Sequence, residues 1–459
     1  MATTATVLRG QHSAEKVLPR AVSQSVPRPT TIARYLLVFT LMAAPTAFGA
    51  VQTWAWASLA VIAAVLLVLW AMGCAQNQAV SIRWSALYVP AVLYLLLGAV
   101  QFGRHLTLDP FATREALIKL LTSFVILFLV VQLWADASAR MWKRLGMAVA
   151  IYALSMALFA IVQYFTSYGL IYWNIAAQGG DAFGPYVNHN NYAGLMEMLI
   201  PICLCFALYR SLKDSDQMLL IFGVCGAIAS LLLSGSRGGM IAVAAEIAIL
   251  GVIIWRRNKD RGNFRKWKII GLVSAAGLAV ALFAVTPNSG WQRLASIAGV
   301  VQTPDVTMEN RLTVSRDALA ALHDYRWFGT GLGTFDTVFP QYQTFPTDLA
   351  WTHAHNDYVE ALTETGIVGG LIILSGLLLF AWLVIRNLRA RNNDLQWWIQ
   401  LGAALGCCGL LIHSFADFNL HIPANMAWFA ACAGLAIAPA ARSGSKQDVV
   451  APVKSRRQA

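Results

Sequence analysis

Charged side chains are scarce in this sequence of 459 residues: they make up 12% of it, against about 25% in an ordinary soluble domain. This shortage excludes a water-soluble enzyme. Lys and Arg outnumber the acids by 34 to 22, and in a soluble protein the resulting charge of +12 would suggest a nucleic-acid partner. However, several runs of about 18 to 20 residues carry no charge, which is the length that spans a bilayer. We therefore predict an all-α polytopic membrane protein that lies in a lipid bilayer and has no nucleic-acid partner.

The apolar runs predict about 12 transmembrane helices. Basic residues concentrate in alternate connections, for example at Arg256, Arg257 and Lys259. Because basic loops remain in the cytoplasm, we expect both termini to be cytoplasmic. The predicted segments are a basic cytoplasmic tail (1–32), transmembrane helices 1–9 (33–286), a large outer loop (287–357), helices 10–12 (358–438) and a second cytoplasmic tail (439–459).

Cysteine is missing from the predicted outer loops, since all seven cysteines fall within or beside the spans. We therefore expect no disulfide framework and no cysteine metal or redox site. Histidine has the opposite distribution: of the eight histidines, only His12 lies on the predicted inner side. Titratable chemistry is expected on the outer side, although a single histidine can also be tolerated at the headgroup layer.

The long outer loop contains a stretch without Gly or Pro, Met308 to Tyr325. Its apolar residues recur at helical spacing, which predicts an amphipathic helix lying on the membrane or capping the bundle. The apolar side is expected to carry Leu312, Ala318, Leu319 and Leu322. Arg311 and Arg316, on the same helix, would lie roughly 140° apart and need not form one site.

Glycine recurs in the segment FGTGLGTF, at Gly329, Gly331 and Gly333. A phosphate-binding loop of the dinucleotide type needs a preceding strand and a following helix, and this context is lacking. A tight turn that returns the chain to the bilayer is the favoured interpretation.

Arg237 lies in a short turn, LSGSRGG, between two apolar helices. An arginine at that depth is costly unless it meets an anion or a carboxylate. Snorkelling to the headgroups is the alternative. We favour an anion site, because the adjacent glycines allow a close approach of backbone and ligand.

Two histidines stand close together in the segment WTHAHNDY, where the chain re-enters the membrane. His353, His355 and Asp357 would share a face of an extended segment and could bind a metal, but a further ligand pair is not visible. A general base is the second interpretation, since imidazole suits that role near neutral pH. A helix cap by Asn356 or Asp357 is the structural alternative.

A third outer segment, FGPYVNHNNYAG, leads into another span. Asn190 or Asn191 is expected to cap that helix, whose N-terminus would suit a diphosphate. Glu197 and Glu246 are carboxylates within spans and are therefore functional candidates.

Together these motifs resemble, in their order along the chain, the O-antigen ligase and lipid-linked-glycan polymerase superfamily of bacterial inner membranes. Four pieces carry the resemblance: an N-x-N-x-x-A helix opening (Asn188, Asn190, Ala193), Ser-Arg-Gly-Gly (Ser236 to Gly239), an arginine-led helix followed by a glycine-rich turn (Arg311; Arg326 to Gly333), and His-Asn-x-Tyr before a helix interrupted by glycine (His355, Asn356, Tyr358, Gly366).

The resemblance implies a metal-independent, inverting glycosyltransferase at the periplasmic face, without a cofactor. Its donor would be an undecaprenyl-diphosphate-linked glycan and its acceptor lipid A-core, as in O-antigen ligation. A glycan polymerase and a protein O-oligosaccharyltransferase are alternatives, and a transporter or flippase is a third class. Arg237 and Arg311 would bind the diphosphate and His355 would be the general base, although His353 or His189 could take that role. The other expected substrate-binding residues are Asn188, His189, Asn190, Glu197, Arg316, His353, Asn356 and Tyr358.

Overall fold

The computed structural model describes residues 26–78, 80, 82–177, 181–209, 212–257, 306–346, 350–390 and 394–439. Within these ranges the protein is helical apart from one small antiparallel hairpin, in which Leu170 pairs with Ala176. The all-α prediction did not include this hairpin. The helices and strands are α1 (Arg28–Thr46), η1 (Phe48–Ala50), α2 (Thr53–Gln76), α3 (Tyr88–Gly103), α4 (Pro110–Trp134), α5 (Ala139–Thr166), β1 (Leu170–Ile171), β2 (Ile175–Ala176), α6 (His189–Ala207), α7 (Asp214–Ser234), α8 (Arg237–Arg257), α11 (Val306–Asp324), α12 (Phe335–Val338), η2 (Phe339–Gln341), α13 (Asp357–Arg389), α14 (Leu395–His413), η3 (Asn419–His421) and α15 (Pro423–Ile437).

Among the described residues, eight helices are long and apolar enough to cross a membrane: α2, α4, α5, α6, α7, α8, α13 and α14. The apolar helices α3 and α15 are shorter, and α1 covers the first predicted span. The protein is therefore an all-α polytopic membrane protein. The predicted span at 268–286 lies outside the described residues, so the total of about 12 stays a prediction.

Side chains that accept hydrogen bonds from the first turn fix where several helices begin. Asp109 caps α4, Asn356 caps α13 and Asp394 caps α14. Asn188 caps α6 by accepting a bond from the backbone N–H of Asn190. The prediction that Asn190 or Asn191 caps this helix was wrong, because the helix begins at His189, two or three residues earlier than expected.

Helix α6 is the most buried of the eight candidate membrane spans. All residues of its most apolar stretch are buried inside the protein, whereas only 11% of the corresponding residues of α13 are buried. Its neighbour α14 approaches it at two glycines. A Cβ atom on Gly402 would lie 2.5 Å from Cα of Ile202, and one on Gly406 would lie 2.8 Å from Cα of Met198. Small residues allow membrane helices to pack this closely, and the pair thereby forms a rigid centre.

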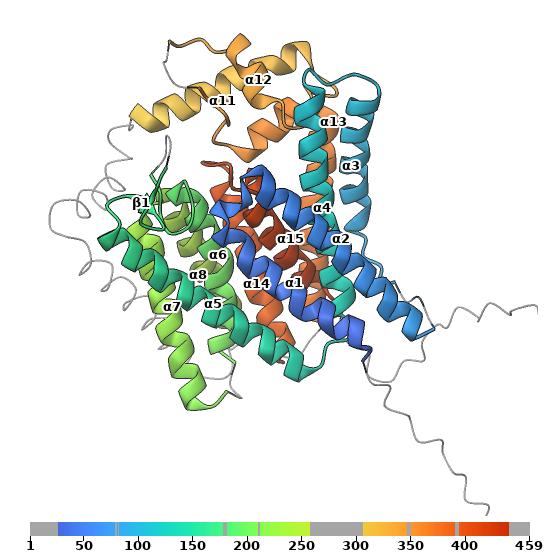
Figure 1. Cartoon of the computed structure of the whole chain (residues 1–459), viewed down its shortest axis with the longest axis vertical. Coiled ribbons are helices and arrows are strands. Elements are labelled where there is room, and N and C mark those ends of the chain that lie inside the picture. The colour runs from blue at the N-terminus through green and yellow to red at the C-terminus, as the bar shows by residue number, and fades with distance from the viewer. Residues whose placement is uncertain are drawn as a thin grey trace, which may run out of the picture.

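Helices α11 and α12 lie across one end of the bundle (Figure 1). The helix predicted from Met308 to Tyr325 corresponds to α11, and its predicted apolar face was right at Ala318 but wrong at Leu312 and Leu319. Leu312 is 67% exposed, whereas Val314 and Ala318 are buried against Phe335 and Phe339. The chain returning through 335–354 covers this side of the helix, so packing within the outer loop decides the buried face.

Candidate active site

Three stretches far apart in sequence meet beneath α11. They are the segment before α13, the connection between α14 and α15, and the adjoining starts of α6 and α8. The connection, SFADFNLHIP, supplies Asp417, Phe418, Asn419 and His421. Their polar contacts form three linked groups.

Asp417 is the centre of the first group. Its side chain is fully buried, and Arg311 and His355 approach its two oxygens: Arg311 Nη1 lies 3.8 Å from Oδ2 and His355 Nδ1 lies 3.8 Å from Oδ1. Arg311 also donates a hydrogen bond of 2.9 Å to the carbonyl of Ala416. Burial alone would raise the pKa of Asp417, but His355, His413 and Arg311 together lower it to about 2. Asp417 is therefore a carboxylate that holds a cation and an imidazole side by side.

His355 itself has a left-handed backbone, with φ of 49°. Such a conformation is uncommon for a residue with a Cβ and often marks a functional position. Its side chain is 20% exposed, and its ring contacts Phe418 edge to face. The imidazole is thus fixed on one side and open to solvent on the other.

The second group joins α6, α8 and α14. His413, the last residue of α14, makes a 2.7 Å hydrogen bond through Nδ1 with Glu197 of α6. The Ser-Arg-Gly-Gly turn at the start of α8 lies directly on this pair: a Cβ on Gly238 would be 2.3 Å from Cδ2 of His413, and one on Gly239 would be 2.9 Å from Oε1 of Glu197. The two glycines therefore bring the backbone next to Arg237 onto the buried pair.

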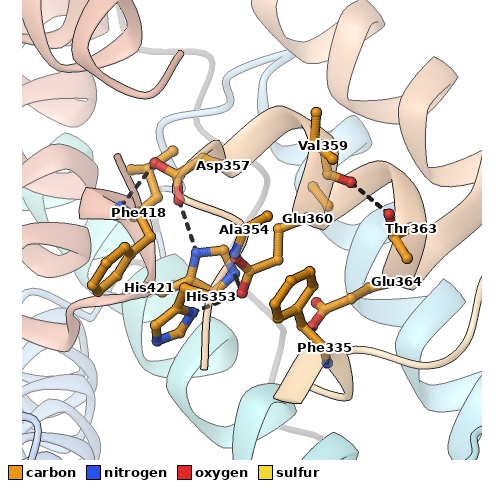
Figure 2. Close-up of polar contacts among 12 residues, drawn as sticks. Phe335, His353, Ala354, Asp357, Val359, Glu360, Thr363, Glu364, Phe418 and His421 are labelled. Carbon is orange, nitrogen blue, oxygen red and sulfur yellow. Dashed lines mark hydrogen bonds and ion pairs between the residues drawn. The ribbon is translucent and has the colours of Figure 1, made fainter. Parts of the chain in front are cut away.

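The third group is a chain of ionisable side chains shown in Figure 2. Asp357 Oδ1 contacts His421 Nδ1 at 2.8 Å, and His421 Nε2 lies 3.3 Å from Oε1 of Glu360. The same Glu360 oxygen lies 2.8 Å from Nδ1 of His353. Burial would lower the pKa of His421, but Glu360 and Asp357 raise it to about 10.

The segment that was expected to hold a metal or a base is thus divided among these groups. His355 faces Asp417, whereas His353 and Asp357 face Glu360 and His421. The metal set of His353, His355 and Asp357, which the sequence left as an alternative, does not form as a unit. Asn356 is the helix cap, accepting bonds of 3.1 Å from the backbone N–H groups of Tyr358 and Val359.

The remaining residues that the sequence predicted to bind substrate lie outside these three groups. Tyr358 donates a hydrogen bond to the carbonyl of Leu411 in α14. His189 donates its backbone N–H to Asp181, and Asn190 is buried at the start of α6. Arg316 is exposed on α11 and makes no ion pair with the described residues, so it is separate from Arg311.

The start of α6 is joined to the centre through asparagines. Asn425 donates to the carbonyl of Asn191 and lies 3.2 Å from Asn419, which in turn lies 3.2 Å from Nδ1 of His413. A Cβ on Gly194 would lie 2.3 Å from Oδ1 of Asn419. The N-x-N-x-x-A segment at the start of α6 therefore contacts the connection that carries Asp417.

Sequence reasoning missed the roles of Asp417, Asn419 and His421. Two signals were available: an aspartate, an asparagine and a histidine stand in a connection of ten residues between apolar runs, and polar groups at such an edge need partners. Their partners lie far away in the sequence, since His421 contacts Asp357 across 64 residues, so spacing alone did not reveal them.

The fold and the buried charges at its end define a class: a polytopic membrane protein with an ionisable site at one end of the bundle. The O-antigen ligase family matches residues 221–374, which include Arg237, Arg311 and His355. This match supports the resemblance to the O-antigen ligase-like superfamily over that part of the chain. The connection with Asp417 lies beyond the matched residues.

The chain is also similar to an uncharacterized protein of Haemophilus influenzae, with 23% identity over 246 residues. The match covers 50% of this chain and 59% of that protein. Because this relative is uncharacterized, the functional interpretation rests on the family match.

Proposed function

We propose that this protein is a glycosyltransferase that moves a glycan from undecaprenyl diphosphate to an acceptor hydroxyl at the periplasmic face, as an O-antigen ligase does with lipid A-core. One observation carries the proposal. Arg311 and His355, which come from separate family motifs, both lie 3.8 Å from the buried carboxylate of Asp417. A phosphate-binding cation and a base are thereby held next to each other.

The two arginines serve the leaving group. When the glycosidic bond to the diphosphate breaks, negative charge develops on the departing oxygens. Guanidinium groups hold such oxygens with two parallel hydrogen bonds. Preorganised donors at the position where charge develops often supply the largest part of catalysis. Arg311 is anchored by Ala416 and Asp417, and Arg237 starts α8 beside His413.

His355 serves the acceptor. Its imidazole takes the proton from the acceptor hydroxyl as that oxygen forms a bond to the anomeric carbon, while the bond from this carbon to the diphosphate breaks. A single displacement of this kind inverts the anomeric centre. Asp417 orients the ring and stabilises the imidazolium, after which the proton passes to water through the exposed side of the ring. This transfer step uses no metal on the reacting atoms.

The acceptor decides between ligase and polymerase. In the proposed role, a deletion strain loses polymer on lipid A-core while lipid-linked polymer accumulates. Lipid A-core that carries single repeats would instead indicate a polymerase. An unchanged glycan profile, in a strain whose own O-antigen pathway is intact, would reject both.

The arginines can be tested apart from the acceptor. Arg311→Ala should abolish transfer, and Arg311→Lys should restore it only in part, because a lysine cannot make the bidentate contact. Full transfer by Arg311→Ala with purified lipid-linked donor would show that Arg311 does not hold the diphosphate.

A further inference from the structure

A cluster next to the proposed transfer site has a composition that this transfer does not use. His353 Nδ1, Glu360 Oε1 and a ring nitrogen of His421 lie within 4.8 Å of one another. Figure 2 shows the three side chains turned toward a common point. Phe418 stacks on His353 at 4.2 Å and also contacts His355, so the cluster adjoins the group around Asp417 but is distinct from it.

We propose that His353, Glu360 and His421 bind a divalent transition metal, for which Zn²⁺ is the best match. Two imidazoles and one carboxylate, with a water in the fourth position, form a donor set common in zinc sites. With ligand bonds of about 2.0 to 2.1 Å, the donors of a tetrahedral zinc lie about 3.3 Å apart. His421 Nε2 lies 3.3 Å from Glu360 Oε1, and His353 Nδ1 lies 2.8 Å from the same oxygen. Movements of less than an ångström at these edges, and closure of the third edge, complete the geometry.

The groups behind the ligands also fit. A metal-binding histidine usually gives its other ring nitrogen to a carboxylate or a carbonyl. His421 does this through Nδ1, which lies 2.8 Å from Oδ1 of Asp357, and Nε2 then points toward the cluster. Glu360 is oriented in the same way, because its second oxygen accepts a 2.8 Å bond from the backbone N–H of Ala354.

Access and charge are compatible with an ion from solution. The side chains of His353 and His421 are 28% and 25% exposed, whereas Glu360 is 2% exposed. An ion can therefore enter from the imidazole side, and a water can complete its shell.

The ion would join two elements that carry the transfer site. His353 and Glu360 flank the start of α13, and His421 lies in η3, four residues after Asp417. A bound ion would therefore fix the connection that presents Asp417 to His355. It would not contact the reacting atoms, which is consistent with the proposed transfer step.

Binding of Zn²⁺ alone tests this proposal without an activity assay. The full chain is purified in detergent, its affinity tag is removed, and it is stripped with a chelator and dialysed. We expect it to take up one Zn²⁺ per chain and to unfold at a higher temperature when Zn²⁺ is added. Co²⁺ in its place should give the visible absorption of a tetrahedral site. No uptake above the background of a chelated sample, or uptake without any thermal shift, would overturn the proposal.

Variants assign the site to these residues. His353→Ala and His421→Ala should each abolish both the uptake and the shift. Asp357→Asn should weaken the affinity by about 10- to 100-fold, because it removes only the group behind His421. The matched control is His323→Ala, whose side chain is 87% exposed on α11 and outside the cluster.

Folding of each variant is checked by its unfolding temperature in the chelator. If His421→Ala does not fold, His353→Ala still gives the answer, because the His353 side chain is partly exposed. Equal zinc binding by His353→Ala and His323→Ala would refute the assignment. Because transfer is not measured, this result is independent of the proposed function.

Discussion

Asp417 is the buried carboxylate that Arg311 and His355 both approach in the proposed transfer site. Its neighbours lower its pKa to about 2 from an ordinary value of 3.8. A carboxyl group with a lowered folded-state pKa stabilises the fold above its unfolded-state pKa, and this contribution is lost as the pH falls toward the folded-state value. The ionised form therefore supports the fold throughout the physiological range.

We predict that the unfolding temperature of the purified protein falls between pH 4 and pH 2, and that Asp417→Asn removes part of this dependence. The shift in pKa corresponds to about 2 kcal/mol at neutral pH. Thermal unfolding in detergent at stepped pH values measures it. The same slope in the wild type and in Asp417→Asn would contradict the assignment of the lowered pKa to Asp417.

Gly238 provides a steric test of the second group. A methyl group there would lie 2.3 Å from Cδ2 of His413, whose ring is held by Glu197 and cannot swing away. We expect Gly238→Ala to lower stability by about 1 to 3 kcal/mol, as overpacking does, and to lower transfer as well. The control is Gly103→Ala, where no atom lies within 4 Å of the added Cβ. Similar unfolding temperatures for the two variants would refute the close packing.

For single residues, the sequence indicated several candidates but not which side chains they contact. The cost of placing charge in a membrane pointed to Arg237 and Glu197. Glu197 is buried and bonded to His413, and the two glycines after Arg237 pack against this pair. However, the sequence suggested that His353 and His355 share a function, and the structure separates them. The left-handed backbone of His355 turns the two rings toward different carboxylates, and no local pattern encodes this turn.

Helix α13 is interrupted at Gly366, where φ is 62° and ψ is −166°. The break releases backbone groups that the glycine-rich turn then binds. The N–H groups of Thr330 and Gly331 donate to the carbonyls of Thr363 and Glu364, and those of Ile367 and Val368 donate to Arg326 and Trp327. Four hydrogen bonds thereby fix the outer loop to the membrane helix that carries Glu360.

We predict that Gly366→Ala destabilises the protein by about 1 to 3 kcal/mol. The alanine would be strained at a positive φ, and its Cβ would lie 2.5 Å from the backbone of Trp327. Gly376→Ala in the same helix is the control, because its Cβ would meet only Pro90 at 3.5 Å; this change should be neutral or stabilising, since alanine favours helix. Thermal unfolding compares the two. Equal stability of both variants would show that the break at Gly366 is dispensable.

For whole elements, the sequence predicted where helices and turns lie better than which face of a helix is buried. Apolar periodicity located the helices closely, and the glycine-rich segment was correctly favoured as a turn. The buried face of α11 was predicted wrongly at Leu312 and Leu319, because the chain that covers the helix, around Phe335 and Phe339, follows after a change of direction. Contacts of this kind depend on tertiary packing, which a hydrophobic pattern along one helix does not contain.

The ionisable groups of the candidate site contact one another beside the start of α13, such as Arg311 with Asp417 and His421 with Glu360. Figure 1 shows α11 and α12 lying across this end of the bundle. The pairs at the loops between other helices, such as Arg83 with Asp136, belong to the segments predicted to be cytoplasmic. The positions of the basic loops predict which side of the membrane each end faces. The sequence therefore predicts that the end of the molecule with α11 and α12 faces the outer side of the membrane.

We predict that a cysteine at position 323 is accessible from outside and one at position 140 is not. In intact spheroplasts, a membrane-impermeant maleimide should label His323→Cys and should label Arg140→Cys only after permeabilisation. Both positions are exposed in the structure, so a difference in labelling reports the side of the membrane. Labelling of Arg140→Cys alone would place the candidate site in the cytoplasm and contradict the proposed reaction.

The most direct measurement of the central claim is transfer by purified His355→Ala, reconstituted with lipid-linked glycan and lipid A-core and compared with His323→Ala. Loss of a general base typically slows a reaction by about 100-fold or more. We therefore expect His355→Ala to lose transfer to that extent while it retains wild-type thermal stability, and His323→Ala to remain fully active. Wild-type transfer rates in His355→Ala would contradict the account, because the acceptor hydroxyl would then be activated elsewhere.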